Sequence, residues 1–161
     1  MRWLMAAALA AAIIPQNAFA KSLSTHLGIG FTSAPNGPTA LTARFFLPNG
    51  SPTSNIAIEA RGGFSSDEDS ATTDQLLFGV RGLYGFVAED HLNVYASAAV
   101  EMIMESDATT PRVSPGISIE YFPFGMEFLG FSAEFGVAME LDENRLLQTY
   151  GNPAAGLSYY F

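Results

Sequence analysis

The feature that most constrains this chain is a regular alternation of apolar and polar residues, which recurs from residue 25 to the last residue. Alternation at every second position predicts β-strands, because successive side chains of a strand point to opposite faces of the sheet. We find no sustained spacing of three and four that would predict an amphipathic helix. The chain therefore predicts an all-β fold of eight segments: residues 25–32, 41–47, 56–64, 76–86, 92–104, 113–121, 129–141 and 154–161.

The lengths of these segments distinguish two classes of β protein. The five segments between residues 56 and 141 are 9 to 13 residues long. Strands of globular proteins are commonly about 5–6 residues long, whereas a tilted strand needs about 9–11 residues to cross the hydrocarbon core of a bilayer. Segment length therefore favours strands that span a membrane.

Charged residues recur near the middle of the segments, on the polar face. If the apolar face contacts lipid, these side chains point into the lumen of a barrel, where a buried ion is costly unless it is paired. Near-balanced opposite charge suits such a lumen. The predicted lumen charge network contains three arginines and four glutamates: Arg44, Glu59, Arg61, Arg81, Glu101, Glu120 and Glu134.

Gly, Ala and Ser share the polar face with these charges. Small residues fit a lumen of eight strands, because such a barrel is only wide enough for side chains to fill it. A soluble barrel would instead place the apolar face in its core and leave the charges in water. The alternation alone is compatible with both arrangements, so the soluble barrel stays open as an alternative.

The first 20 residues have the pattern of a secretory signal peptide. Arg2 precedes an apolar run over residues 3–14, which is too short to span a bilayer, and "AFA" ends at Ala20 before Lys21. We therefore expect cleavage after Ala20. The predicted organisation is a signal peptide over residues 1–20 and one barrel domain over residues 21–161.

Composition excludes several classes of function. The chain has no cysteine, so disulfides, thiol catalysis and cysteine metal sites are excluded. It has 16 acidic and 7 basic residues, which argues against nucleic acid as a partner, because phosphate contacts need Lys and Arg. The acidic run "SDEDS" over residues 66–70 lacks the ligand spacing of a calcium loop. We expect no metal and no cofactor.

The connections between segments differ in charge when both termini are placed in the periplasm. The outer connections then carry most of the acidic loop residues, whereas the inner ones are mainly turns. These outer acidic residues are Asp67, Glu68, Asp69, Asp74, Asp107, Asp142 and Glu143. The sequence therefore predicts acidic loops on the outer side.

The chain ends in "GLSYYF", in which Leu157, Tyr159 and Phe161 alternate with smaller or more polar neighbours. This ending resembles the closing strand of bacterial outer-membrane barrels, and "PGISIEYFPF" over residues 115–124 resembles their sixth-strand region. Over residues 21–161 the chain is similar in architecture to small barrels of the OmpA/OmpX type.

This resemblance implies an eight-stranded antiparallel up-and-down transmembrane β-barrel in a Gram-negative outer membrane, with periplasmic termini. It also implies contact with outer-membrane lipid and lipopolysaccharide, and a monomeric state. In that family Leu157, Tyr159 and Phe161 would form the C-terminal signal that the barrel-assembly machinery recognises.

Four functional hypotheses follow. The favoured one is a non-enzymatic role in envelope structure or surface contact through the acidic loops. The alternatives are a narrow gated pore through the Arg/Glu-lined lumen, a lipid-modifying enzyme, and a soluble periplasmic barrel that binds a small apolar ligand. The enzyme would need a histidine beside a nucleophile. His26 and His91 both fall on the periplasmic side with no serine motif around them, so no catalytic residue is predicted.

Overall fold

The computed structural model describes residues 23–34, 38–48, 54–65, 74–105, 108–124, 126–141 and 147–161. The predicted signal peptide lies outside the described residues. So do six of the seven acidic loop residues, all except Asp74. Among the described residues, no helix is long and apolar enough to cross a membrane.

Most of the described residues lie in strands, which are joined by turns and loops. The strands are β1 (Leu27–Ser33), β2 (Ala40–Leu47), β3 (Ile56–Ser65), β4 (Gln75–Ala88), β5 (Leu92–Met104), β6 (Thr109–Tyr121), β7 (Leu129–Leu141), β8 (Leu147–Gly151) and β9 (Ala154–Tyr160).

β8 and β9 are two parts of one long strand, because both pair with β7 in a single register. Val137 pairs with Gly151 in β8, and Glu134 pairs with Ala154 in β9. Asn152 and Pro153 separate the two parts, and proline has no backbone N–H to donate to the ladder. Counted in this way, the barrel has eight strands.

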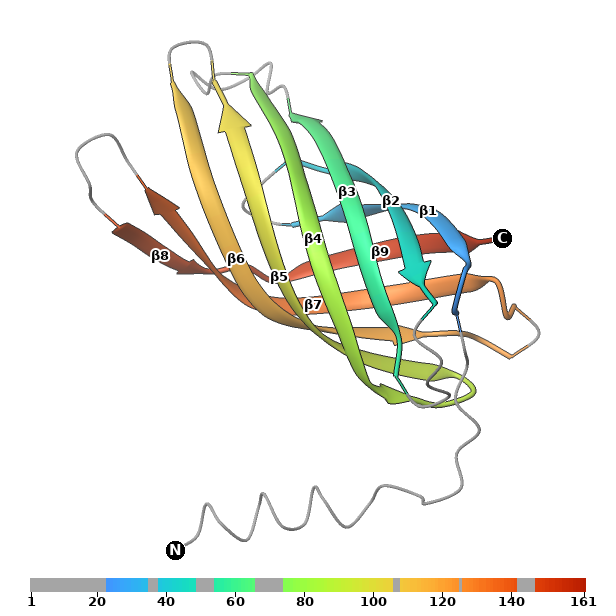
Figure 1. Ribbon diagram of the computed structural model, residues 1–161. Helices are drawn as coiled ribbons and strands as arrows, with labels where there is room; N and C mark the ends of the chain where they lie inside the picture. Colours follow the sequence, from blue (N-terminus) through green and yellow to red (C-terminus); the bar gives the residue numbers. More distant parts are fainter. Residues whose placement is uncertain are drawn as a thin grey trace, which may run out of the picture.

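Each strand pairs antiparallel with the next along the chain, and β9 pairs with β1 to close the sheet. The strands wrap around one lumen, as Figure 1 shows. The predicted fold, an all-β barrel of eight antiparallel strands in up-and-down order, is confirmed. Below, the terminal end is the end at which β1 begins and β9 finishes, and the loop end is the opposite end.

Two predicted boundaries are wrong at the loop end. The sequence predicts no strand between residues 141 and 154, but β8 occupies Leu147–Gly151 and extends the β7 ladder. The sixth strand was expected to begin at residue 113, but it begins at Thr109. Pro111 lies before the predicted segment, yet it takes part in the ladder opposite Met102. In both places a long neighbouring strand extends the pairing beyond the local sequence signal.

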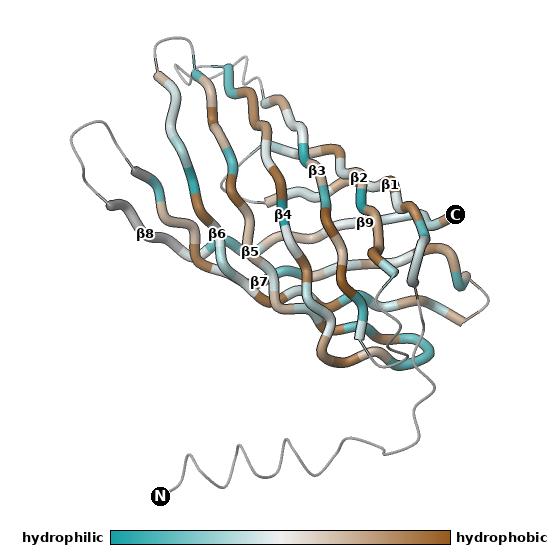
Figure 2. Tube along the Cα trace, in the orientation of Figure 1, coloured by the Kyte–Doolittle hydropathy of each residue, from teal (hydrophilic) through white to brown (hydrophobic). Residues whose placement is uncertain are grey.

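Burial along the strands is inverted relative to a soluble protein. On the outward face, Leu41 is 72% and Phe135 60% exposed, whereas Arg44 and Glu59 inside are 2% and 0% exposed. Figure 2 shows the underlying alternation of hydropathy along the strands. Water-soluble monomers rarely expose apolar surface over a whole molecule. The soluble barrel required the apolar set to face inward, so the burial pattern contradicts that alternative.

Candidate functional site

The described lumen holds two apolar clusters and a network of charged side chains. The smaller cluster, toward the loop end, consists of Ala40, Leu77 and Ile103. Near the terminal end lies a larger aromatic and aliphatic cluster, every member of which is 2% exposed or less. Next to it, and continuing toward the loop end, lies a network of charged side chains. The larger cluster consists of Leu23, Phe46, Ala57, Leu83, Tyr95, Phe122 and Tyr160. These packed side chains close the terminal end of the lumen.

Glu120 on β6 lies where the cluster meets the charged network. The Tyr160 hydroxyl donates a hydrogen bond to Glu120 Oε1 over 2.5 Å, and the Tyr95 hydroxyl donates to Oε2 over 3.1 Å. Arg44 Nη1 lies 3.2 Å from Oε1 and also donates to the Tyr160 oxygen over 2.7 Å. The four side chains come from β6, β9, β5 and β2, so they tie distant parts of the barrel wall together across the lumen.

Glu59 on β3 is the centre of the network. Arg44 Nε and Nη2 each lie 2.8 Å from Glu59 Oε2, and Arg81 Nη2 lies 2.8 Å from Oε1. Arg61 Nε is farther from Oε1, at 3.6 Å. Strand register explains this arrangement, because Arg44, Glu59 and Arg81 are direct cross-strand partners on β2, β3 and β4. Arg81 also pairs with Glu134 on β7.

Glu101 on β5 holds the loop-end part of the network. Arg61 Nη1 lies 2.8 Å from Glu101 Oε1, and Arg112 Nε and Nη2 each lie 2.8 Å from Oε2. Arg112 Nη1 is also 3.9 Å from Glu140 Oε1. Arg61 Nη2 donates to the Thr32 hydroxyl over 2.7 Å. A continuous chain of contacts therefore runs from Tyr160 to Glu140.

The structure places all seven residues of the predicted network on the inward face and joins them by ion pairs. It adds Arg112 and Glu140, so the described network contains four arginines and five glutamates. The predicted network omits Arg112 because the sixth segment was predicted to begin at residue 113, the residue after Arg112. Its position two residues before Ser114, on the same face, could have indicated it.

Inward glycines make room for the large side chains. A Cβ atom at Gly130 would lie 2.7 Å from Glu120 Oε1, and one at Gly79 would lie 2.6 Å from Glu101 Cγ. At Gly28 the added atom would overlap the Tyr160 ring. Gly82 faces outward, and a Cβ there would meet nothing within 4 Å. Part of the glycine content of the polar face is therefore explained by the volume of the charged and aromatic side chains opposite.

Little space remains at the loop end of the lumen. A cavity of about 20 Å³ lies there, and Arg61, Glu101, Arg112 and Glu134 are among its lining residues. One water molecule needs about 10–15 Å³ of such space. This cavity therefore has room for one water or two.

Neither histidine lies in the charged network. His26 Nδ1 is 3.1 Å from the Ser24 carbonyl oxygen, and the His91 ring is 4.1 Å from the Phe124 ring. Both lie at the terminal end, in segments that adjoin strand ends. Within the described ranges no group of three His, Asp or Glu side chains could hold a metal ion.

The three residues of the predicted C-terminal signal alternate along β9 and the residue after it, and their side chains are on the outward face, as the alternation predicts. Tyr159 and Phe161 are 54% and 58% exposed. Leu157 and Tyr159 pair with Phe31 and Ile29 of β1. This strand closes the barrel, so its outward side chains belong to the apolar outer surface.

Comparisons with known proteins agree on the fold. No family model matches the sequence, and no curated protein matches it. Among solved structures, the N-terminal β-barrel domain of Pseudomonas aeruginosa OprF aligns with a TM-score of 0.62 at 14% identity, covering 86% of this chain and 98% of that domain. The Yersinia pestis outer membrane protein Ail aligns with a TM-score of 0.56 at 10% identity, covering 84% of this chain and 97% of Ail. The chain therefore has the fold of these small eight-stranded β-barrels.

Proposed function

We propose that this protein is an outer-membrane barrel with periplasmic termini and a closed lumen. Its role would be non-enzymatic, in envelope structure or in surface contact through acidic loops. The observation that carries this proposal is the inverted burial: the large apolar side chains face outward, and the Arg and Glu side chains are paired inside. A bilayer is the solvent in which such a surface is stable.

The distribution of outward aromatic residues supports a membrane location. Phe31 and Phe64 lie toward the loop end, and Tyr121, Phe86 and Tyr159 lie toward the terminal end. All five are at least 43% exposed. Transmembrane barrels carry aromatic residues at both membrane interfaces around an apolar band. The apolar middle of the wall here includes Val80 and Val100, which pair between β4 and β5.

The even number of strands and the predicted signal peptide support the orientation, because both termini then lie at one end of the barrel. Connection lengths do not separate the two ends. The connections have eight, three and seven residues at the terminal end, and six, nine, four and five residues at the loop end. The terminal end would therefore face the periplasm, as a cleaved signal peptide over residues 1–20 requires.

A closed lumen supports a structural role over a pore. The terminal end is blocked by the aromatic cluster, and the charges beyond it are paired with one another. A gated pore would require these pairs to separate and the aromatic rings to move. That alternative predicts a small conductance that changes when Arg81 or Glu101 is neutralised.

The surface-contact role would depend on the acidic loops. Asp74, which precedes β4, is exposed, and the other acidic loop residues lie outside the described part of the chain. Carboxylates at that position could bind divalent cations that also bind lipopolysaccharide phosphates. The lipid-modifying alternative predicts altered lipid A on overexpression, lost in His26→Ala. We disfavour it because both histidines would face the periplasm.

The test is gel mobility of protein from isolated outer membranes, with and without boiling, followed by planar-bilayer recording. We expect a boiling-dependent shift, because folded barrels of this kind resist detergent until they are heated, and no channel events. Recovery in the soluble periplasmic fraction without a shift would refute the membrane proposal. A stable conductance that is lost in Glu101→Gln would instead favour the gated pore.

A further inference from the structure

The terminal end of the lumen is closed in part by a segment that precedes the first strand. Leu23 is 2% exposed and belongs to the aromatic cluster, although β1 begins only at Leu27. Of the other members of the cluster, five lie on strands, and Phe122 directly follows β6. Leu23 is therefore the member that can leave the cluster while every strand stays paired.

Two hydrogen bonds join this segment to the described barrel. The Leu23 N–H donates to Asn55 Oδ1 over 3.3 Å, and the Thr25 N–H donates to the Phe46 carbonyl oxygen over 3.0 Å. The His26 N–H donates to the Leu23 carbonyl oxygen over 2.9 Å, which closes a turn over residues 23–26. We call residues 23–25 the strap. His26 is its hinge, because the His26 carbonyl oxygen already accepts a hydrogen bond from the Phe46 N–H of β2.

The backbone of the strap is strained at Thr25. Its φ is 66°, and among the described residues it is the non-glycine residue with a positive φ. Thr25 is the third residue of the turn, a position where a positive φ normally requires Gly or Asn, and a β-branched residue rarely adopts such a φ. Strain of this kind persists only where the surrounding structure offsets it. The Thr25 side chain is exposed, so the closed strap balances the burial of Leu23 and two hydrogen bonds against backbone strain.

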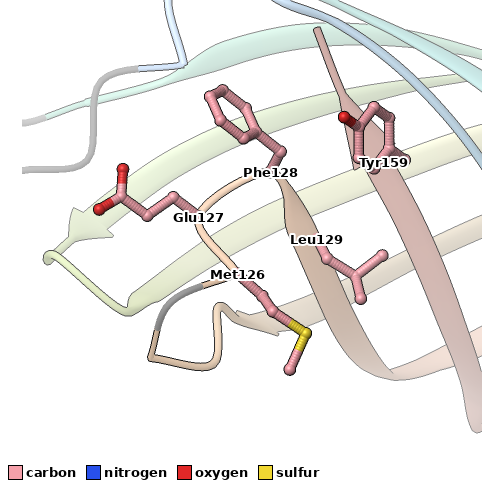
Figure 3. Close-up of a pocket in the computed structure, with 5 residues that line it drawn as sticks. All are labelled: Met126, Glu127, Phe128, Leu129 and Tyr159. Carbon is pink, nitrogen blue, oxygen red and sulfur yellow. The ribbon is translucent and has the colours of Figure 1, made fainter.

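Access to the cluster runs through the end of the barrel and not through its wall. Consecutive residues of β9 face opposite sides there, because Tyr160 is 0% exposed inside and Tyr159 is 54% exposed outside. Figure 3 shows Tyr159 beside Phe128, and their ring centroids are 6.5 Å apart. β9 is also paired along both edges, with β1 and β7. The wall is therefore continuous at this point, and the strap lies at the opening of the lumen.

Withdrawal of Leu23 would uncover the rings of Tyr95 and Tyr160 and the Glu120 carboxylate, to which both hydroxyls donate. We propose that the strap is a movable closure that admits water and small solutes to this carboxylate while the barrel stays folded. The side on which it opens rests on the proposed function, in which the terminal end faces the periplasm. The Arg and Glu side chains beyond Glu120 stay paired, so an open strap hydrates one end of the lumen without making a channel.

The test is the rate at which a single buried cysteine reacts, because the chain has no cysteine of its own. Ala57→Cys places a thiol in the cluster, at a site that is 1% exposed. The probe is 2-aminoethyl methanethiosulfonate, added to the folded protein in micelles, and intact mass follows the reaction. We expect slow labelling that becomes at least about tenfold faster with Leu23→Ala, because a buried leucine side chain is lost. Asn55→Ala removes one hydrogen bond to the strap and should accelerate labelling about fivefold.

Thr25→Gly is the decisive variant, because it should change the rate in the opposite direction. Glycine adopts a positive φ without steric cost, so the closed strap becomes more stable and labelling should slow about fivefold. Thr25 is exposed, so this substitution leaves the packing of the lumen intact. The boiling-dependent gel shift checks that each variant is folded.

Ala40→Cys is the matched control for the labelled site. It replaces an alanine that is 2% exposed in the smaller apolar cluster, toward the loop end. Unfolding of the whole barrel would expose both cysteines alike, whereas opening of the strap exposes only the one at position 57. None of the three other substitutions should change the labelling rate at position 40.

Equal acceleration at positions 57 and 40 would overturn the inference, because the variants would then act through unfolding of the barrel. Absence of labelling at position 57 in every variant would also overturn it, and so would an unchanged rate in Thr25→Gly. The two proposals fail in different ways. A normal gel shift with any of these results removes only the movable strap, whereas a soluble protein without a shift removes the membrane location as well.

Discussion

The two ends of the lumen hold buried carboxylates in different surroundings. Glu120, near the terminal end, accepts hydrogen bonds from Tyr95 and Tyr160 within the aromatic cluster. Glu101, near the loop end, is paired with Arg61 and Arg112 and borders the cavity of about 20 Å³. Both carboxylates are 1% exposed or less, so they differ in what can replace a lost partner rather than in burial.

This difference predicts an uneven distribution of stability along the lumen. A buried ion that loses its partner among closely packed aromatic rings has little room for water to replace that partner, and the cost of burial remains. Beside a cavity that can admit water, part of the lost interaction can be restored. We therefore expect substitutions near the terminal end to destabilise the barrel more than equivalent substitutions near the loop end.

The largest expected effect is that of Arg44→Ala. Arg44 pairs with both Glu59 and Glu120, so its removal leaves two buried carboxylates with fewer partners. Breaking a buried ion pair costs about 3–5 kcal/mol, and we expect the free energy of unfolding to fall by that amount. The measurement is the urea dependence of the folded fraction, read by the boiling-dependent gel shift. Wild-type behaviour would contradict the lumen assignment.

Arg81→Ala should follow, with a loss on the order of 3 kcal/mol, near the lower end of the range for a buried pair. Glu59 would keep Arg44 and Arg61, but Glu134 would lose its contact with Arg81. The same urea titration measures the effect. A loss greater than that of Arg44→Ala would mean that the centre of the network, and not the aromatic cluster, dominates stability.

Arg112→Ala is the matched substitution at the loop end. Glu101 would keep Arg61, and the adjacent cavity would enlarge. We expect a loss of about 1–3 kcal/mol, the cost of removing one partner of a buried group. Equal losses for Arg112→Ala and Arg44→Ala in parallel titrations would remove the proposed difference between the two ends.

Gly130→Ala tests whether the inward glycines are required for space. The new methyl group would press on the Glu120 carboxylate, and overpacking typically costs about 1–3 kcal/mol. Gly82→Ala is the control, because Gly82 faces outward into open space. A thermal gel-shift series should show a lower transition temperature for Gly130→Ala and an unchanged transition temperature for Gly82→Ala. Equal transitions would mean that the lumen side chains can move aside.

The smallest expected effect is that of Tyr95→Phe, which removes one hydroxyl donor to Glu120 and keeps the ring. A hydrogen bond of this kind contributes about 1 kcal/mol. Tyr84→Phe removes an outward hydroxyl on a side chain that is 54% exposed and should change nothing. If both variants unfold at the same urea concentration, the tyrosine contacts do not stabilise the cluster.

Much of the fold could be predicted from the sequence, because a barrel wall repeats one simple signal. The segments 92–104 and 129–141 match β5 and β7 to the residue. The polar face also identified the seven charged residues that the structure brings together. Side chains on one face of a closed narrow barrel have nowhere else to point, so alternation alone places them in the lumen.

The aromatic cluster was harder to predict. Phe46, Tyr95 and Tyr160 were on the predicted inward face, but nothing in their local sequence indicated that they converge. Their meeting depends on cross-lumen distances between β2, β5 and β9, which only the closed barrel defines. Arg112 and β8 were missed for a related reason, because the neighbouring strand determines how far each ladder extends.

The central claim is that the apolar face meets lipid and the charged face does not, and single tryptophans test it directly. The sequence has one tryptophan, Trp3 in the predicted signal peptide, so the processed chain should have none, which its mass can check. In vesicles of brominated phospholipid, the fluorescence of Phe135→Trp should be strongly quenched, because Phe135 is outward and 60% exposed. The fluorescence of Phe46→Trp, at a site that is 0% exposed within the lumen cluster, should be quenched little. Strong quenching at position 46 with none at position 135 would contradict the account, because it would mean that the face assigned to the lumen contacts lipid.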